Sequence, residues 1–267
     1  MNSDNFPISR LLRSVTAVEC LVLLISGGGL FFLPDVLGPG WPWPLTPFNT
    51  RFLGAAYLGS LVSTLVLVWR PYWSPARVVV PMISLFTLVV LGVSLTNLAR
   101  FTQNGLSTIG WFVLYIGIPA NALYHLWLYR AQPAVSGIGQ PRPLRFLLTV
   151  QVALLGVYGA LLLVAPAFAS GFWPWTIDDF HARMYSAGFL TPALGALLLL
   201  RSGTALEFRA LGLTQAIAGS FALGGLLIVN SAVQRVDWTL PGTWAWIALF
   251  LYIAASGAAL LGYARSP

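Results

Sequence analysis

Lysine is absent from this chain of 267 residues, so arginine supplies all 14 basic side chains. Without lysine the protein can form no Schiff base with retinal or pyridoxal phosphate, and it has no phosphate-binding lysine of the Walker type. Cysteine occurs once, as Cys20, which excludes an intrachain disulfide and a metal site built from several cysteines. These absences remove several classes of enzyme.

Charge is scarce in general. Only 8% of the residues are charged and 58% are hydrophobic, whereas a soluble domain carries about 25% charged residues. Long apolar stretches, each sufficient to cross about 30 Å of hydrocarbon as a helix, lack the alternating pattern of a membrane β-barrel. There are eight, at residues 12–33, 52–69, 78–99, 109–129, 146–168, 184–200, 210–233 and 243–263. The predicted fold is all-α, a polytopic membrane protein with eight transmembrane helices.

The arginines predict the orientation of the chain. With both termini in the cytoplasm, ten arginines fall on the inner side and four on the outer side, as the positive-inside rule requires. The net charge of +7 is then a topology signal and an attraction for anionic lipid headgroups, and it requires no nucleic-acid partner. We expect a multi-pass protein of the cell (inner) membrane, with cytoplasmic termini and membrane lipids as partners.

The sequence also repeats itself at a constant offset of 132 residues. The segment GWPWPLTPFNTR, residues 40–51, is echoed by FWPWTIDDFHAR, residues 172–183. We predict two tandem four-helix repeats, residues 1–130 and 145–267, joined by a cytoplasmic linker at residues 131–144. Because each repeat contains an even number of spans, both copies have the same orientation. A pseudo-two-fold axis along the membrane normal should relate them.

The repeated phrase has the features of a helix start. Thr46 before Pro47 is typical of an N-cap followed by proline at the first helical position, and Asp178 takes the cap position in the second copy. Its tryptophans are expected at the water–lipid interface. The W-P-W…R pattern, which covers the two loops and the following helix starts, resembles a pattern in uncharacterised multi-pass bacterial membrane proteins. That resemblance implies no particular activity.

Glu19 is the only acidic residue deep within a predicted span, and ionisable side chains inside a membrane are functional candidates. If the first and fourth spans are neighbours, as in an up-and-down bundle, Glu19 can meet Asn121 and His125. Gln151 is the counterpart of Glu19 in the second repeat. These four residues form a candidate intramembrane polar site, either a proton or cation relay or a paired carboxyl that fastens two helices.

A second candidate site is predicted at the outer ends of the helices. Arg51 and Arg183 each follow a tryptophan loop, and Asn97 and Asn230 occupy matching positions with a one-residue slip. Two arginines near one axis can hold an anion such as a carboxylate or phosphate group. The alternative is interfacial anchoring of the arginines, with salt bridges to Asp35 or Asp178. Separately, Arg183 has an anionic neighbour four residues earlier, Asp179.

No catalytic constellation, metal site or cofactor is predicted. His125 and His181 fall at opposite ends of the bundle, on the order of 25 Å apart. The shortage of nucleophiles, bases and metal ligands disfavours an enzyme. The first functional hypothesis is a small-solute or ion carrier with its site between the two repeats. The alternative is a non-catalytic subunit of a membrane complex, with other membrane subunits as partners, or a lipid-interacting scaffold.

Overall fold

The computed structural model describes residues 5–101, 105–132, 137 and 139–265, and this part of the chain is all-α. Eight of its helices are long and apolar enough to cross a membrane. They are α1 (Arg10–Phe32), α3 (Pro47–Trp69), α4 (Trp73–Thr96), α5 (Gly105–Leu128), α6 (Arg142–Val164), α8 (Asp179–Arg201), α9 (Ala205–Val233) and α10 (Pro241–Tyr263). The chain is thus a multi-pass integral membrane protein, as its sequence predicts, because apolar helices of this length span the hydrocarbon and satisfy their own backbone polar groups within it.

Two short helices, α2 (Pro34–Leu37) and α7 (Pro166–Ala169), follow α1 and α6 and were not predicted. Of the predicted linker at 131–144, residues 133–136 and 138 lie outside the described part of the chain. Helix α6 begins at Arg142, within the predicted linker.

The predicted helix starts are confirmed. The hydroxyl of Thr46 accepts a hydrogen bond from the backbone N–H of Asn49, and Pro47 follows as the first helical residue of α3. The carboxylate of Asp178 accepts a hydrogen bond from the backbone N–H of His181 at the start of α8. Both side chains satisfy backbone donors that a helix leaves free at its first turn.

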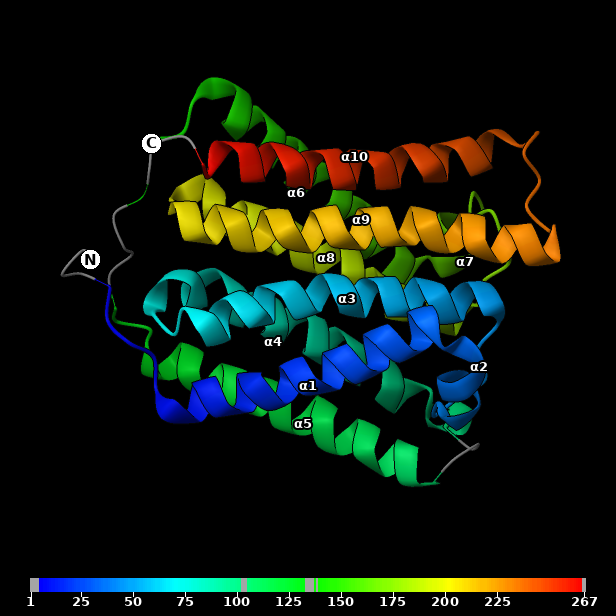
Figure 1. Ribbon diagram of the computed structural model, residues 1–267, viewed down its shortest axis with the longest axis horizontal. Coiled ribbons are helices and arrows are strands. Elements are labelled where there is room, and N and C mark those ends of the chain that lie inside the picture. Colours follow the sequence, from blue (N-terminus) through cyan, green and yellow to red (C-terminus); the bar gives the residue numbers. More distant parts are fainter. Residues whose placement is uncertain (1–4, 102–104, 133–136, 138, 266–267) are drawn as a thin grey trace.

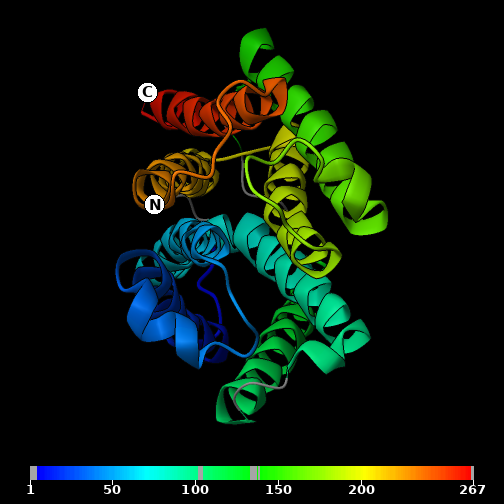
Figure 2. The same ribbon diagram turned by 90° about the vertical axis from the view of Figure 1, so that its right-hand side faces the viewer.

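The eight long helices form two layers of four, seen end-on in Figure 2. One layer runs α1, α3, α9, α10, and the other runs α5, α4, α8, α6. Within the layers α3 packs against α9 and α4 packs against α8. The first four and last four long helices therefore meet along two central helix pairs.

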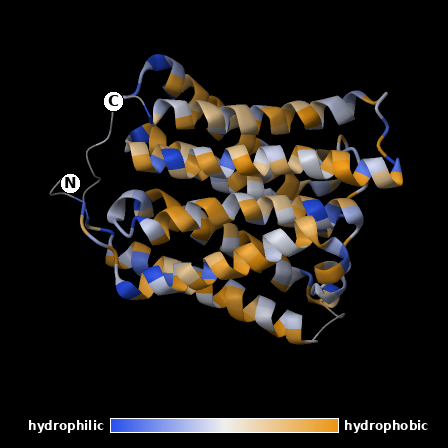
Figure 3. Ribbon diagram, in the orientation of Figure 1, coloured by the Kyte–Doolittle hydropathy of each residue, from blue (hydrophilic) through white to orange (hydrophobic). Residues whose placement is uncertain are grey.

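The two ends of the bundle differ in what they carry (Figure 1). The start of α1 and the end of α10 lie at one end, which we call the terminal face. The segments 33–46, 97–101, 165–178 and 234–240 lie at the other end, which we call the loop face. Hydrophilic residues gather mainly towards these two ends and apolar residues dominate between them (Figure 3), as expected for helices that cross lipid.

Glycines allow close helix approach at equivalent places in the two halves. A Cβ added at Gly27 would lie 3.0 Å from the backbone nitrogen of Leu58 in α3, and one added at Gly159 would lie 3.0 Å from that of Leu190 in α8. Both the glycines and the leucines are 132 residues apart. Small residues at such crossings permit the backbone contact that holds membrane helices together.

Three of the four tryptophans of the repeated phrase do not face lipid as predicted, and the fourth, Trp175, is half-buried. Trp41, Trp43 and Trp173 are buried in the protein core rather than at a lipid interface. Trp43, for example, packs edge-on against Trp111 at 4.7 Å and against Phe180 at 5.2 Å between ring centroids. The physical reason is that the loops fold inward across the loop face, where the rings bury more apolar surface against each other than an interface position allows.

Candidate functional site

A cavity of about 340 Å³ lies among α1, α3, α4 and α5. This volume is within the range of small-molecule sites, roughly 300–1,000 Å³. Apolar side chains and many hydroxyl groups share the lining. The hydroxyls belong to Ser26, Tyr57, Ser60, Ser63, Thr64, Thr87, Ser107, Tyr115, Thr191 and Thr214. The last two lie on α8 and α9, so the site borders the second half of the chain but is formed mainly by the first half.

The cavity extends from the middle of the bundle towards the loop face. At one end its lining includes Val36 and Gly40, which are exposed at the loop face. At the other end is Glu19, nine residues into α1 and thus about 13 Å from the start of that helix, at 1.5 Å per residue. The cavity therefore reaches the surface at the loop face and stops short of the terminal face.

Glu19 lies on the buried face of α1. Buried residues recur at helical spacing at Thr16, Glu19, Leu23 and Gly27, whereas Val18 and its neighbours on the opposite face are exposed. Glu19 is only 8% exposed, lines the cavity, and has no hydrogen bond or ion pair within the described residues. Its carboxyl group is thus buried next to a space rather than next to a protein partner.

Glu19 differs in this respect from Gln151, the residue at the 132-residue offset. Gln151, 132 residues after Glu19, exchanges two hydrogen bonds with Gln215, at 3.1 and 3.0 Å. The residue 132 positions before Gln215 is Ile83, which lines the cavity and has no hydrogen-bonding group in its side chain. The amide pair satisfies itself, and Gln215 also partly lines a smaller cavity of about 80 Å³.

An aromatic cluster forms the wall of the cavity nearer the loop face. The ring of Trp41 lies 5.8 Å from that of Trp111 and 6.0 Å from that of Tyr57, and Trp111 lies 4.1 Å from Tyr115. The hydroxyls of Tyr57 and Tyr115 are 3.1 Å apart and share a hydrogen bond. The four rings hold one another in place, so this wall is pre-formed.

Asn121 and His125 do not join Glu19 in a hydrogen-bonded group. The buried ring of His125 contacts the hydroxyl of Ser9 through Nε2 at 2.6 Å and the backbone carbonyl of Asn121 through Nδ1 at 2.8 Å. Both ring nitrogens are therefore occupied, and the histidine ties α5 to the N-cap of α1. The side-chain oxygen of Asn121 is buried without a partner in the described chain.

The segment before α1 closes the terminal face below the cavity. The ring of Phe6 stacks on Trp73 at 5.8 Å and lies 5.6 Å from Tyr129. Backbone hydrogen bonds from Ile8 to Pro71 and from Trp73 to Phe6 fix this segment in place. We call Phe6, Trp73 and Tyr129 the terminal plug.

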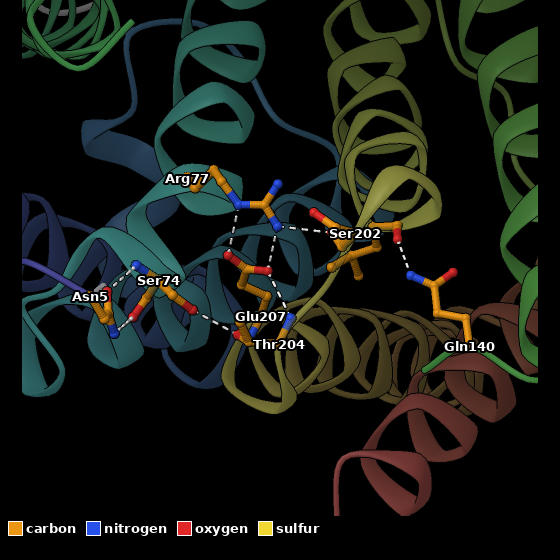
Figure 4. A network of polar contacts seen from close by, with 8 residues as sticks. Asn5, Ser74, Arg77, Gln140, Ser202, Thr204 and Glu207 are labelled. Carbon is orange, nitrogen blue, oxygen red and sulfur yellow. Dashed lines mark hydrogen bonds and ion pairs between the residues drawn. The ribbon is translucent and has the colours of Figure 1, made fainter. Parts of the chain in front are cut away.

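A polar network that the sequence analysis missed joins the two halves at the terminal face (Figure 4). Arg77 on α4 donates two hydrogen bonds to the fully buried carboxylate of Glu207 on α9, at 3.1 and 2.7 Å, and a third to the carbonyl of Ser202. The hydroxyls of Ser74 and Thr204 are 2.6 Å apart. The spacing of Thr204 and Glu207, a capping box before an apolar run, is the sequence signal that could have revealed it.

The residues of the predicted outer anion site lie at the loop face but are not linked to one another. Arg183 is 3.9 Å from Asp179, as predicted. Asn230 accepts a hydrogen bond from the backbone of Val236, and Asn97 donates to backbone and threonine oxygens nearby. Arg51 has its Nε buried without a hydrogen-bond partner in the described chain. No hydrogen bond or ion pair connects any two of these four residues where the chain is described.

Two reciprocal hydrogen bonds cross between the halves at the loop face. The indole of Trp43 donates to Nε2 of His181, at 3.2 Å, and the indole of Trp175 donates to the side-chain oxygen of Asn49, at 2.9 Å. The donors differ by 132 positions, and so do the acceptors. Each tryptophan loop therefore binds the first turn of a helix in the opposite half.

Asp178 anchors this crossing. Its carboxylate accepts hydrogen bonds from the ring and from the backbone of His181 and pairs with Arg100 at 3.3 Å. The hydrogen bond from the His181 ring, assisted by the backbone N–H and the charge of Arg100, outweighs partial burial and lowers the pKa of Asp178 to about 2.

The described residues contain no group of three or more His, Cys, Asp or Glu side chains arranged to hold a metal ion. Searches of protein-family models, of curated proteins and of solved structures find no match to this chain.

Proposed function

We propose that this protein is a carrier for a small solute that binds in the cavity around Glu19. The observation that supports the proposal is a buried carboxyl group, without a partner in the described chain, lining a cavity of about 340 Å³ within the helix bundle. Ionisable groups within membrane helices are costly and commonly mark a substrate or ion pathway. A purely structural bundle would be more stable with the cavity filled by apolar side chains.

The proposed carrier consists of two tandem four-helix repeats, residues 1–130 and 145–267, related by a pseudo-two-fold axis along the membrane normal. Contacts that recur at the 132-residue offset support this arrangement. The pairing of α3 with α9 corresponds to that of α8 with α4, and the bond from Trp43 to His181 corresponds to that from Trp175 to Asn49. Two similar halves can rock against each other, which is a common basis of alternating access.

In the proposed orientation the termini are cytoplasmic, the loop face is external, and the protein lies in the cell (inner) membrane with lipid around it. The distribution of arginines supports this choice. The cavity then opens outward and the terminal plug separates it from the cytoplasm. This is the geometry of an outward-open carrier.

Uptake into proteoliposomes tests the proposal. The purified protein is assayed with a fixed panel of radiolabelled probes that comprises an alkylamine, an amino acid, a polyol, a carboxylate and sodium ion. We expect saturable uptake of at least one probe, and its loss in Ser60→Trp, which fills the cavity. The matched control Ser231→Trp adds the same ring at an exposed site on α9 and should retain uptake.

Monodisperse elution of both variants shows that loss of uptake is not loss of folding. If the wild-type protein takes up no probe in a saturable manner, the carrier proposal fails, and a complex subunit or lipid-interacting scaffold replaces it.

A further inference from the structure

The lining of the cavity contains an acidic side chain but no basic one. Glu19 is the only acidic residue in the lining, and neither arginine nor histidine lines it. The arginines on the same helices do not pair with Glu19. Arg77 is paired with Glu207, and Arg10 and Arg13 on α1 are exposed. A buried carboxylate without a positive partner is strongly unfavourable in a low dielectric, so the site favours a ligand that supplies the positive charge.

The hydroxyl groups of the lining point to the same class of ligand. The hydroxyls of Ser60, Ser63, Thr64 and Thr87 donate their hydrogens to carbonyl oxygens one turn earlier in their own helices. Their oxygens keep lone pairs and therefore act as hydrogen-bond acceptors towards the cavity. An ammonium group offers up to three N–H donors to such a surface, whereas an anion offers none.

The aromatic wall adds a third contribution. The faces of tryptophan and tyrosine rings attract cations within about 6 Å, most strongly where the cation is desolvated. Trp41, Tyr57, Trp111 and Tyr115 are rigidly packed on the loop-face side of the cavity. A bare alkali ion would fill little of a volume of about 340 Å³, since on the same measure a single water molecule needs only about 10–15 Å³.

We infer that the cavity binds a small organic monocation, an amine that is protonated at neutral pH, with its ammonium group at Glu19 and its apolar part against the aromatic wall. The inference rests on the proposed binding role of the cavity and adds the charge class of the ligand. Glu19 supplies the counter-charge, the hydroxyl oxygens accept from the N–H groups, and the rings cover the rest of the molecule.

Cysteine labelling with reagents of opposite charge tests this inference directly. Cys20 is the only cysteine, so Cys20→Ser gives a cysteine-free background. Ser60→Cys then places one thiol in the cavity, and Ser231→Cys places one on the exposed end of α9. Each purified variant reacts with trimethylammonioethyl or sulfonatoethyl methanethiosulfonate, two reagents of similar size and opposite charge, and mass spectrometry gives the rates.

The cation-to-anion rate ratio at Ser60→Cys, divided by that at Ser231→Cys, should exceed about tenfold. The approach of a cation favours the ionised form of Glu19, which then attracts the cation through a low dielectric, whereas an anion gains no such attraction. Adding Glu19→Gln should reduce this normalised ratio to about one. Asp237→Asn, which removes the same charge from an exposed loop position, should leave it unchanged. Phenethylammonium should slow labelling of Ser60→Cys, and phenylacetate and benzyl alcohol should not.

The possible failures are distinguishable. Equal normalised reaction with both reagents, or equal protection by benzyl alcohol, would overturn the amine inference while leaving an accessible cavity and the proposed carrier intact. Reaction of Ser231→Cys together with complete inertness of Ser60→Cys would refute the binding role itself. The normalised cation-to-anion ratio at Ser60→Cys in protein that retains Glu19 tests the amine inference even if the Glu19→Gln protein does not fold.

Discussion

Two buried glutamates, Glu207 and Glu19, differ in whether the protein supplies partners for their carboxyl groups. Glu207 is fully buried, but it receives hydrogen bonds from Arg77 and from the backbone of Thr204, and it lies in the first turn of α9, where the helix dipole favours an anion. Glu19 is buried with none of these compensations in the described chain. We therefore attribute the burial of Glu207 to the stability of the bundle, and we propose a ligand-binding role for Glu19.

This assignment predicts a large loss of stability in Glu207→Gln. Removing one partner of a buried ion pair leaves Arg77 with an uncompensated charge, which costs about 3–5 kcal/mol. Thermal or denaturant unfolding in detergent measures the effect. Arg183→Gln is the comparison, because the pair of Arg183 with Asp179 is exposed and should contribute less than about 1 kcal/mol.

Replacing both Arg77 and Glu207 measures how much the two side chains stabilise each other. The double variant Arg77→Met, Glu207→Met should be less destabilised than the sum of its single variants, since no isolated charge remains. Additive losses would show that the two side chains do not stabilise each other.

The lowered pKa of Asp178 predicts a pH dependence at the loop face. A carboxyl group whose pKa is lower in the folded than in the unfolded protein stabilises the fold above its unfolded pKa, and this contribution is lost as pH falls through the folded pKa. The stability advantage of the wild-type protein over Asp178→Asn should therefore decline between about pH 4 and about pH 2. Asparagine also caps helices, so the N-cap is retained. An advantage that stays constant down to pH 2 would contradict the assigned hydrogen bonds.

At the scale of elements, α10 is held to α9 by close backbone contact. A Cβ added at Gly257 would lie 2.4 Å from the backbone nitrogen of Ala216 and 2.5 Å from the carbonyl of Gly212, and neither backbone atom can yield cheaply. We predict that Gly257→Ala destabilises the bundle by about 1–3 kcal/mol through overpacking. The measurement is unfolding in detergent, followed by circular dichroism.

Gly262 provides a matched control on the same helix. A Cβ there meets nothing within 4 Å. Gly262→Ala should leave stability unchanged or raise it by up to about 1 kcal/mol, because alanine loses less entropy than glycine on entering a helix. Similar losses in both variants would mean that the effect does not arise from the contact with α9.

The sequence predicts features that depend on neighbouring residues and misses those that depend on contacts between residues far apart in the chain. The long helices and the caps at Thr46 and Asp178 depend on local composition and spacing, and they were predicted correctly. The burial of Trp43 depends on Phe180, 137 positions away in the other half, and no local pattern carries that information.

The candidate site was predictable only in part, for the same reason. Glu19 was identifiable as a lone acidic residue in an apolar span. The cavity was not, because it depends on which side chains of distant helices meet. Glu19 and Ile83 both line it, and Ile83 offers no hydrogen bond, whereas Gln151 pairs with Gln215. A difference between two distant, equivalent positions becomes visible only when the helices are placed against each other.

At the scale of the whole molecule, the direction of the bundle in the membrane decides which compartment the cavity opens to. The arginine bias predicts that the terminal face is cytoplasmic, because cationic segments are retained on that side during insertion. In the Cys20→Ser background, Ala131→Cys and Ser231→Cys each place one thiol at an exposed position, on the terminal and loop faces respectively.

We predict that a membrane-impermeant maleimide labels Ser231→Cys in intact cells and labels Ala131→Cys only after the membrane is permeabilised. The opposite pattern would invert the protein: the cavity would then open to the cytoplasm, and the terminal plug would face the outside. A carrier whose ligand is a cation would work against different gradients in these two orientations, because the membrane potential drives cations inward. Labelling therefore also determines whether an amine bound at Glu19 is positioned for uptake from the outside or for release to it.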